Sequence, residues 1–138
     1  MSNLTLRYLR SAEDDFGRLH ASVETSDFSG RGSAYAQWQD VDAFARNLSA
    51  YPLREDEPPI LRCGFNDGHR DNLLILVEVT PSDNRGTLRV RVEIADPVEP
   101  TRRVRTHFTS HYPQLADFQN ALLQVIRSDV HEAVLRGD

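Results

Sequence analysis

The sequence has no lysine, only one cysteine, and no long run of apolar residues. A signal peptide needs an apolar run after a basic start, and a membrane-spanning helix needs about 18 consecutive apolar residues, so we expect neither. The lone cysteine, Cys63, cannot form an internal disulfide, which agrees with a reducing compartment. We therefore expect a cytoplasmic protein.

All 16 basic residues are arginine, a skew that we interpret as coding bias rather than as a functional signal. The formal net charge of -5 argues against a dedicated nucleic-acid binder, because neutralising phosphates usually requires a basic surface. A basic or neutral partner fits this net charge better.

The length of 138 residues falls in the range of one domain. Hydrophobic residues make up 39% of the chain and charged residues 27%, which is the balance of an ordinary globular protein rather than of a disordered one. We therefore predict a single α+β domain over residues 1–138.

Alternation of apolar and polar residues is the main pattern in the chain and is typical of half-buried strands. It predicts strands over 3–10, 18–24, 33–38, 60–65, 73–79, 88–94 and 103–108. The run 73–79 is almost continuously apolar, which favours a strand buried on both faces. Gly30 and Gly32 suggest a turn or bulge before the third strand, and the polar residues 66–71 predict another turn.

Two segments show helical spacing instead. Val41, Phe44, Ala45 and Leu48 predict a helix over 40–50, which Pro52 ends. A final helix begins near Pro113, a residue suited to a first helical position. Its apolar positions are Leu115, Phe118, Leu122, Val125 and Ile126, and the spacing continues through Val130, Ala133 and Val134 to a stop at Gly137. The predicted fold is an antiparallel meander sheet of six to seven strands, with one helix inserted after the third strand and a C-terminal helix packed on the sheet.

No spacing in the sequence demands a particular chemistry. Among the histidines only His107 and His111 are close enough to suggest a shared metal, but they straddle the end of a predicted strand and the start of a helix. Cys63 lies in a short strand without a helix N-terminus to activate it, so we interpret it as a small core residue. We expect no catalytic residue, no metal and no cofactor.

Two clusters of acidic residues lie in predicted loops. They are Glu13, Asp14 and Asp15, and Glu55, Asp56 and Glu57. One interpretation is that both clusters are solvated loop charges that have no function. The functional interpretation is a pair of loops that attract a basic partner, because like charges held together steer association.

The last predicted hairpin carries an unusual polar face. Its members are Arg89, Arg91, Arg103, Arg105 and His107. Like charges facing each other across strands repel, and Glu78 and Glu93 are placed to compensate. The face is therefore either a solvated surface with interleaved ion pairs or a docking face for an acidic or phosphate-bearing partner.

Three aromatic residues, Phe28, Tyr35 and Trp38, surround the predicted junction between the third strand and the first helix. Aromatic residues at such a corner usually close the core. Trp and Tyr also anchor protein interfaces, so both interpretations stay open.

Several segments resemble one known family when taken together. They are Phe28-Ser29-Gly30, Trp38-Gln39-Asp40-Val41-Asp42-Ala43-Phe44 with Leu48, Pro59-Ile60-Leu61, Gly86-Thr87-Leu88-Arg89-Val90 and the helix over 112–123. In this order they resemble small bacterial immunity-type proteins of the WapI kind, which are encoded beside polymorphic toxins. The resemblance implies a non-enzymatic cytoplasmic protein that binds and blocks a cognate toxin domain. It assigns no role to any single residue, because contact residues in that family vary with the toxin.

Three functions are consistent with these observations. The first is a non-enzymatic protein-interaction module, with toxin neutralisation as its sharpest form. The alternative is a small anion- or nucleotide-binding accessory domain that uses the arginine-lined sheet face. The third is a homodimer with a purely structural role.

Overall fold

The computed structural model describes residues 1–66 and 71–138. The elements in this part of the chain are β1 (Ser2–Arg10), β2 (Phe16–Glu24), β3 (Ser29–Gln37), α1 (Trp38–Asn47), β4 (Ile60–Asn66), β5 (Asp71–Pro81), β6 (Thr87–Ala95), β7 (Arg103–His111), α2 (Tyr112–Ile126) and β8 (Ala133–Gly137). The predicted α+β class with antiparallel strands is confirmed. The turn predicted at 66–71 falls mainly on residues 67–70, which lie outside the described residues.

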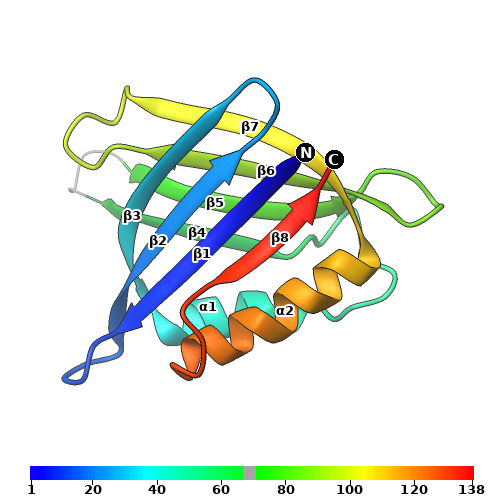
Figure 1. The fold of residues 1–138 in the computed structure, drawn as a ribbon. Coiled ribbons are helices and arrows are strands. Elements are labelled where there is room, and N and C mark those ends of the chain that lie inside the picture. The colour runs from blue at the N-terminus through cyan, green and yellow to red at the C-terminus, as the bar shows by residue number, and fades with distance from the viewer. Residues whose placement is uncertain (67–70) are drawn as a thin grey trace.

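The strands form two four-stranded antiparallel sheets, so the prediction of one meander of six to seven strands was wrong. Sheet A has the order β3-β2-β1-β8, and sheet B has the order β4-β5-β6-β7. The two sheets pack face to face, and their strands cross in Figure 1. Alternation along the chain predicts where strands are, but it does not tell which strands pair. The break between the sheets falls where α1 separates β3 from β4.

The C-terminal segment is a strand and not the predicted continuation of the last helix. The helix α2 ends at Ile126, and Ser128 with φ 64 lies in the left-handed region, which a right-handed helix does not contain. Beyond it β8 pairs with β1, and Leu135 lies opposite Leu4. Val130, Ala133 and Val134 match helical spacing by coincidence.

One hydrophobic core lies between the two sheets and extends to the helices. The largest fully buried side chains are Phe44, Phe118, Leu4, Leu6, Leu19, Leu61, Ile75, Leu76, Leu88, Leu115, Leu122 and Leu135. Both helices lie at the same end of the sheets (Figure 1), and α2 packs against α1, β1, β7 and β8. The amide Nε2 of Gln119 donates to the carbonyl oxygen of Ala45 at 2.9 Å and ties the helices together. Neither helix of the described chain is long and apolar enough to cross a membrane.

Gly30 and Gly32 lie inside β3 and not in a turn or bulge before it, so that prediction was wrong. Both glycines face sheet B. A Cβ on Gly30 would lie 2.8 Å from Cγ1 of Val104, and one on Gly32 would lie 2.7 Å from Cγ2 of Ile94. The glycines therefore allow β3 to pack closely over β6 and β7, because a larger residue would push the sheets apart.

The prediction of a strand buried on both faces is confirmed in β5. Ile75 and Val77 face the core, whereas Leu76 lies outside the main core cluster and is still only 2% exposed. The register places Leu76 between Arg62 and Glu93. Long side chains on the flanking strands cover an apolar residue in this way.

The two sheets meet along β7 and β8. The backbone N–H of Asp138 donates to the carbonyl oxygen of Thr109 at 2.9 Å, and the hydroxyl of Ser110 donates to the carbonyl oxygen of Arg136 at 2.7 Å. The two chain ends lie close together at this corner (Figure 1). The C-terminal strand therefore links both sheets.

Candidate functional site

The outward-facing side chains of β1, β2 and β3 form rows across sheet A, because alternate residues of a strand point to the same face. The register defines the rows. Three of them are Leu9, Arg18 and Tyr35; Arg7, His20 and Ser33; and Thr5, Ser22 and Arg31, and a fourth is Asn3, Glu24 and Ser29. We call the nine residues of the first three rows the outer face of sheet A.

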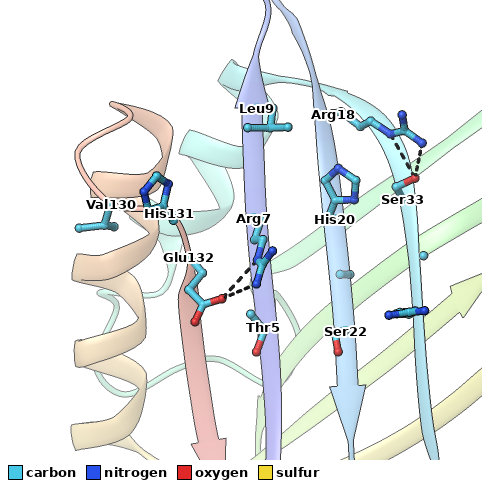
Figure 2. Close-up of a pocket in the computed structure, with 13 residues that line it drawn as sticks. Thr5, Arg7, Leu9, Arg18, His20, Ser22, Ser33, Val130, His131 and Glu132 are labelled. Carbon is cyan, nitrogen blue, oxygen red and sulfur yellow. Dashed lines mark hydrogen bonds and ion pairs between the residues drawn. The ribbon is translucent and has the colours of Figure 1, made fainter.

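A hollow of about 1310 Å³ lies over most of this face. Thr5, Arg7 and His20 line its floor, and Val130, His131 and Glu132, which precede β8, form its margin (Figure 2). Small-molecule pockets have volumes of roughly 300–1,000 Å³. The hollow is therefore larger than a typical small ligand needs.

Two arginines on the outer face are held in fixed orientations. Nε and Nη2 of Arg7 donate to Oε2 of Glu132 at 3.2 and 3.1 Å. Nε and Nη2 of Arg18 donate to the hydroxyl of Ser33 at 3.3 and 3.2 Å. Figure 2 shows both contacts. Among the described residues, neither Arg18 nor Arg31 forms an ion pair with a carboxylate.

The predicted arginine-lined face is the outer face of sheet B, where the strand register aligns the residues of β6 and β7. Oε1 of Glu93 lies 3.2 Å from Nη1 of Arg103 and 3.2 Å from Nε of Arg105. Nη2 of Arg91 lies 3.4 Å from Oε2 of Glu78. Three of the four arginines are therefore paired with the two carboxylates that the sequence suggested.

The remaining arginine of this face, Arg89, contacts a histidine rather than a carboxylate. Nη2 of Arg89 lies 3.4 Å from Nδ1 of His107, and both side chains are exposed. Besides the hollow over the outer face of sheet A, a smaller one of about 490 Å³ lies near the chain ends, and neither is lined by the arginines of this face. The structure thus places the larger hollow on the opposite sheet from the predicted docking face.

The first acidic cluster lies in the turn between β1 and β2. Oδ1 of Asp14 accepts a hydrogen bond from the backbone N–H of Phe16 at 2.9 Å, and Oδ1 of Asp15 lies 3.4 Å from Nε1 of Trp38. Glu13 is exposed beside them. Two of the three carboxylates therefore have a local structural role.

The second acidic cluster lies in the connector between α1 and β4. Arg54 pairs with Asp56 at 2.8 Å and with Glu57 at 3.4 Å, and Glu55 is exposed. This connector and the turn between β1 and β2 lie at opposite ends of the molecule in Figure 1. The six acidic residues therefore do not form one surface.

The three aromatic residues do not form the cluster that the sequence suggested, because the length of β3 separates Phe28 from Trp38. Trp38 packs against the core, and the guanidinium carbon of Arg10 lies 4.8 Å from its ring centroid. Tyr35 is 70% exposed and Phe28 is 61% exposed. Core closure thus describes Trp38 alone, and Tyr35 belongs to the outer face of sheet A.

Cys63 is only 5% exposed, as expected of a core residue. Burial raises the pKa of its thiol to about 12, so it is protonated at neutral pH and is a poor nucleophile. His107 and His111 both lie in β7, where four residues span about 13 Å, too far to share one ion. Within residues 1–66 and 71–138, no three His, Cys, Asp or Glu side chains gather as metal ligands.

Compared with family models, with curated proteins and with solved structures, the chain matches none of them. The function therefore has to follow from the chain's own residues.

The outer face of sheet A was not among the predicted sites. Its signal was present in the alternation of the first three strands, since Arg7 and Leu9, Arg18 and His20, and Arg31 and Tyr35 occupy the polar positions of that pattern. Only the register of three strands brings them together.

Proposed function

We propose that this protein is a non-enzymatic protein-interaction module that binds its partner through the outer face of sheet A. The observation that supports the proposal most is the row Leu9, Arg18 and Tyr35, of which Leu9 and Arg18 line the hollow. Leu9 is 66% exposed and Tyr35 is 70% exposed, so both side chains present apolar area to solvent. Tyr and Arg are the residue types that carry much of the binding energy in protein interfaces.

The shape of the surface favours a macromolecule over a small ligand. Small ligands bind in enclosed pockets that bury most of their area. Here the floor of the hollow is a sheet face, and Tyr35 extends the surface beyond the residues that line the hollow. A protein partner would contact both regions at once.

Toxin neutralisation is the sharpest form of this proposal. A protein that neutralises a toxin by binding it needs an exposed recognition surface and no chemistry of its own. The resemblance to immunity-type proteins of the WapI kind points to the same activity. We propose a cognate toxin domain as the partner and the cytoplasm as the place where the two meet.

The outer face of sheet B is the second surface to consider, because it could hold an anion. Glu78 and Glu93 already neutralise Arg91, Arg103 and Arg105 on that face, and a bound anion would have to compete with these carboxylates. On sheet A only Arg7 faces this competition, from Glu132, whereas Arg18 and Arg31 have no ion pair with a carboxylate among the described residues. We therefore prefer sheet A.

Co-expression with the products of the adjacent genes tests the proposed function. We expect one of these products to be toxic alone, to lose its toxicity when this chain is present, and to co-purify with it. If no adjacent product is toxic and none co-purifies, the toxin-neutralising proposal is wrong.

A matched pair of variants tests the surface in the same experiment. Leu9→Ala combined with Tyr35→Ala should lower the yield of the complex, because it removes the exposed anchors of the outer face of sheet A. Tyr51→Ala removes an exposed aromatic residue in the connector after α1, whose ring lies edge-on against Tyr112, and should leave the yield unchanged. The opposite pattern would assign binding to another surface.

A further inference from the structure

The outer face of sheet A differs in charge from the protein as a whole. The formal net charge of the chain is -5, yet the hollow is lined by Arg7, Arg18 and Arg31, two histidines and one acidic residue, Glu132. A local surface, rather than the net charge, determines which partner is attracted at contact distance. The site is therefore positive on an acidic protein.

Arg7 and Arg18 are held by the same edge of the guanidinium group. In each case Nε and Nη2 donate to a single oxygen, that of Glu132 or that of Ser33. A guanidinium has five N–H donors, so the edge formed by Nη1 and Nη2 keeps donors for another acceptor. That edge matches the two oxygens of a carboxylate.

The fixed orientation also lowers the cost of binding. A free arginine loses side-chain entropy when a partner immobilises it, and an arginine that is already held loses less. Ser33 is neutral, so the positive charge of Arg18 is oriented without being neutralised. The contact with Ser33 thus prepares Arg18 for an incoming anion.

We infer that the outer face of sheet A binds an acidic protein segment. A carboxylate of the segment pairs with the Nη1 and Nη2 edge of Arg18, and Arg31 adds a second positive charge. Glu132 already neutralises Arg7, so Arg7 does not count among the free charges. Leu9 and Tyr35 contact apolar side chains beside the carboxylate. This inference rests on the proposed function and specifies its partner. It replaces the expectation from net charge of a basic or neutral partner.

One feature favours an acidic protein segment over a nucleic acid or a free phosphate. Leu9 and Val130 add apolar area to the lining of the hollow, which apolar side chains of a protein segment contact and a phosphate group does not use.

Titration of the isotope-labelled protein with a short acetylated glutamate-rich peptide that contains leucine tests the inference by NMR. We expect the arginine Nε–H signals of Arg18 and Arg31 and the amide signals of β1 to β3 to shift. Salt should weaken the binding, because the charges are exposed. Shifts confined to the arginines of sheet B, or no shifts, would overturn the inference.

Two variants of equal charge change locate the binding. Arg18→Gln with Arg31→Gln should weaken peptide binding by about tenfold, since it removes charge-assisted hydrogen bonds. Arg89→Gln with Arg105→Gln removes two charges from sheet B and should leave the affinity unchanged. Equal weakening by both pairs would mean that only the total charge matters, which would contradict the inference.

Two further probes separate the sources of anions. A single-stranded oligonucleotide that binds more tightly than the peptide would show that the face is a nucleic-acid site, and inorganic phosphate that causes the same shifts would show a simple anion site. Either result overturns the inference. The proposed function fails on a different result, namely that no adjacent gene product is captured. If an adjacent product is captured and remains bound to the variant Arg18→Gln with Arg31→Gln, only the inference is wrong.

Discussion

Replacing Leu135 by alanine tests the C-terminal strand, the element that the sequence did not predict. Leu135 is 0% exposed in β8 and lies opposite Leu4 of β1. Its neighbour Val134 points to the other face of sheet A and is only partly buried. A helix continued from α2 would have buried Val130 and Val134 instead, so the two structures predict different sensitive positions.

The expected magnitude follows from burial. Truncating a fully buried leucine to alanine costs about 2–5 kcal/mol, through lost apolar contact and the cavity left behind. This is a large part of a typical stability of about 5–15 kcal/mol. Each kcal/mol lowers the melting temperature of a domain of this size by roughly 3–4 °C. Val134→Ala should cost less than about 1 kcal/mol.

Urea unfolding followed by the fluorescence of Trp38, the only tryptophan, measures both variants. We expect the midpoint to fall strongly for Leu135→Ala and slightly for Val134→Ala, with unchanged slopes. Equal losses, or a larger loss for Val134→Ala, would refute the placement of β8 in sheet A.

Three other predictions concern the core and the sheet contacts. Because burial raises the pKa of Cys63 from 9.0 to about 12, the unfolded chain loses the thiol proton first as pH rises, so stability from this group is complete below about pH 9 and falls by up to about 1.4 kcal/mol per unit towards pH 12. Burial also raises the pKa of Tyr8, so unfolding curves for Cys63→Ala should show a smaller alkaline loss than the wild type rather than none, and an equal loss would contradict the burial of the thiol. Glu93→Gln should cost about 1–3 kcal/mol by urea unfolding, because two arginines lose their shared carboxylate, and a loss below about 0.5 kcal/mol would contradict that pairing. Gly137→Ala should lower the melting temperature, because a Cβ there would collide with the carbonyl oxygen of Thr109; an unchanged melting temperature would mean that the contact between β7 and β8 is looser than described.

The strands that the sequence predicted best are those with a clear local pattern. In β6, Leu88, Val90, Val92 and Ile94 alternate with polar residues, and all four are buried. The strand β8 has only five residues, and its partner β1 lies at the other end of the chain. Local alternation carries no information about such a pairing. The residues after α2 match helical spacing, so the sequence predicted a helix where β8 lies.

The two sheet faces show the same limit for the site. The arginines of sheet B lie on the consecutive strands β6 and β7, so their common face follows from one hairpin. The outer face of sheet A needs three strands in register, and the margin of its hollow comes from residues 130–132, far away in the sequence. The net charge of the chain gave no indication of this positive site, because it sums the charges of all residues and is negative.

The affinity of the captured partner for outer-face variants tests the central claim most directly. Isothermal titration of the purified partner against wild type, Arg18→Gln with Tyr35→Ala, and Arg89→Gln with Arg105→Gln gives three dissociation constants. Binding through the outer face of sheet A predicts about a hundredfold loss of affinity for the first variant and none for the second. An unchanged affinity for the first variant together with a loss for the second would contradict the account.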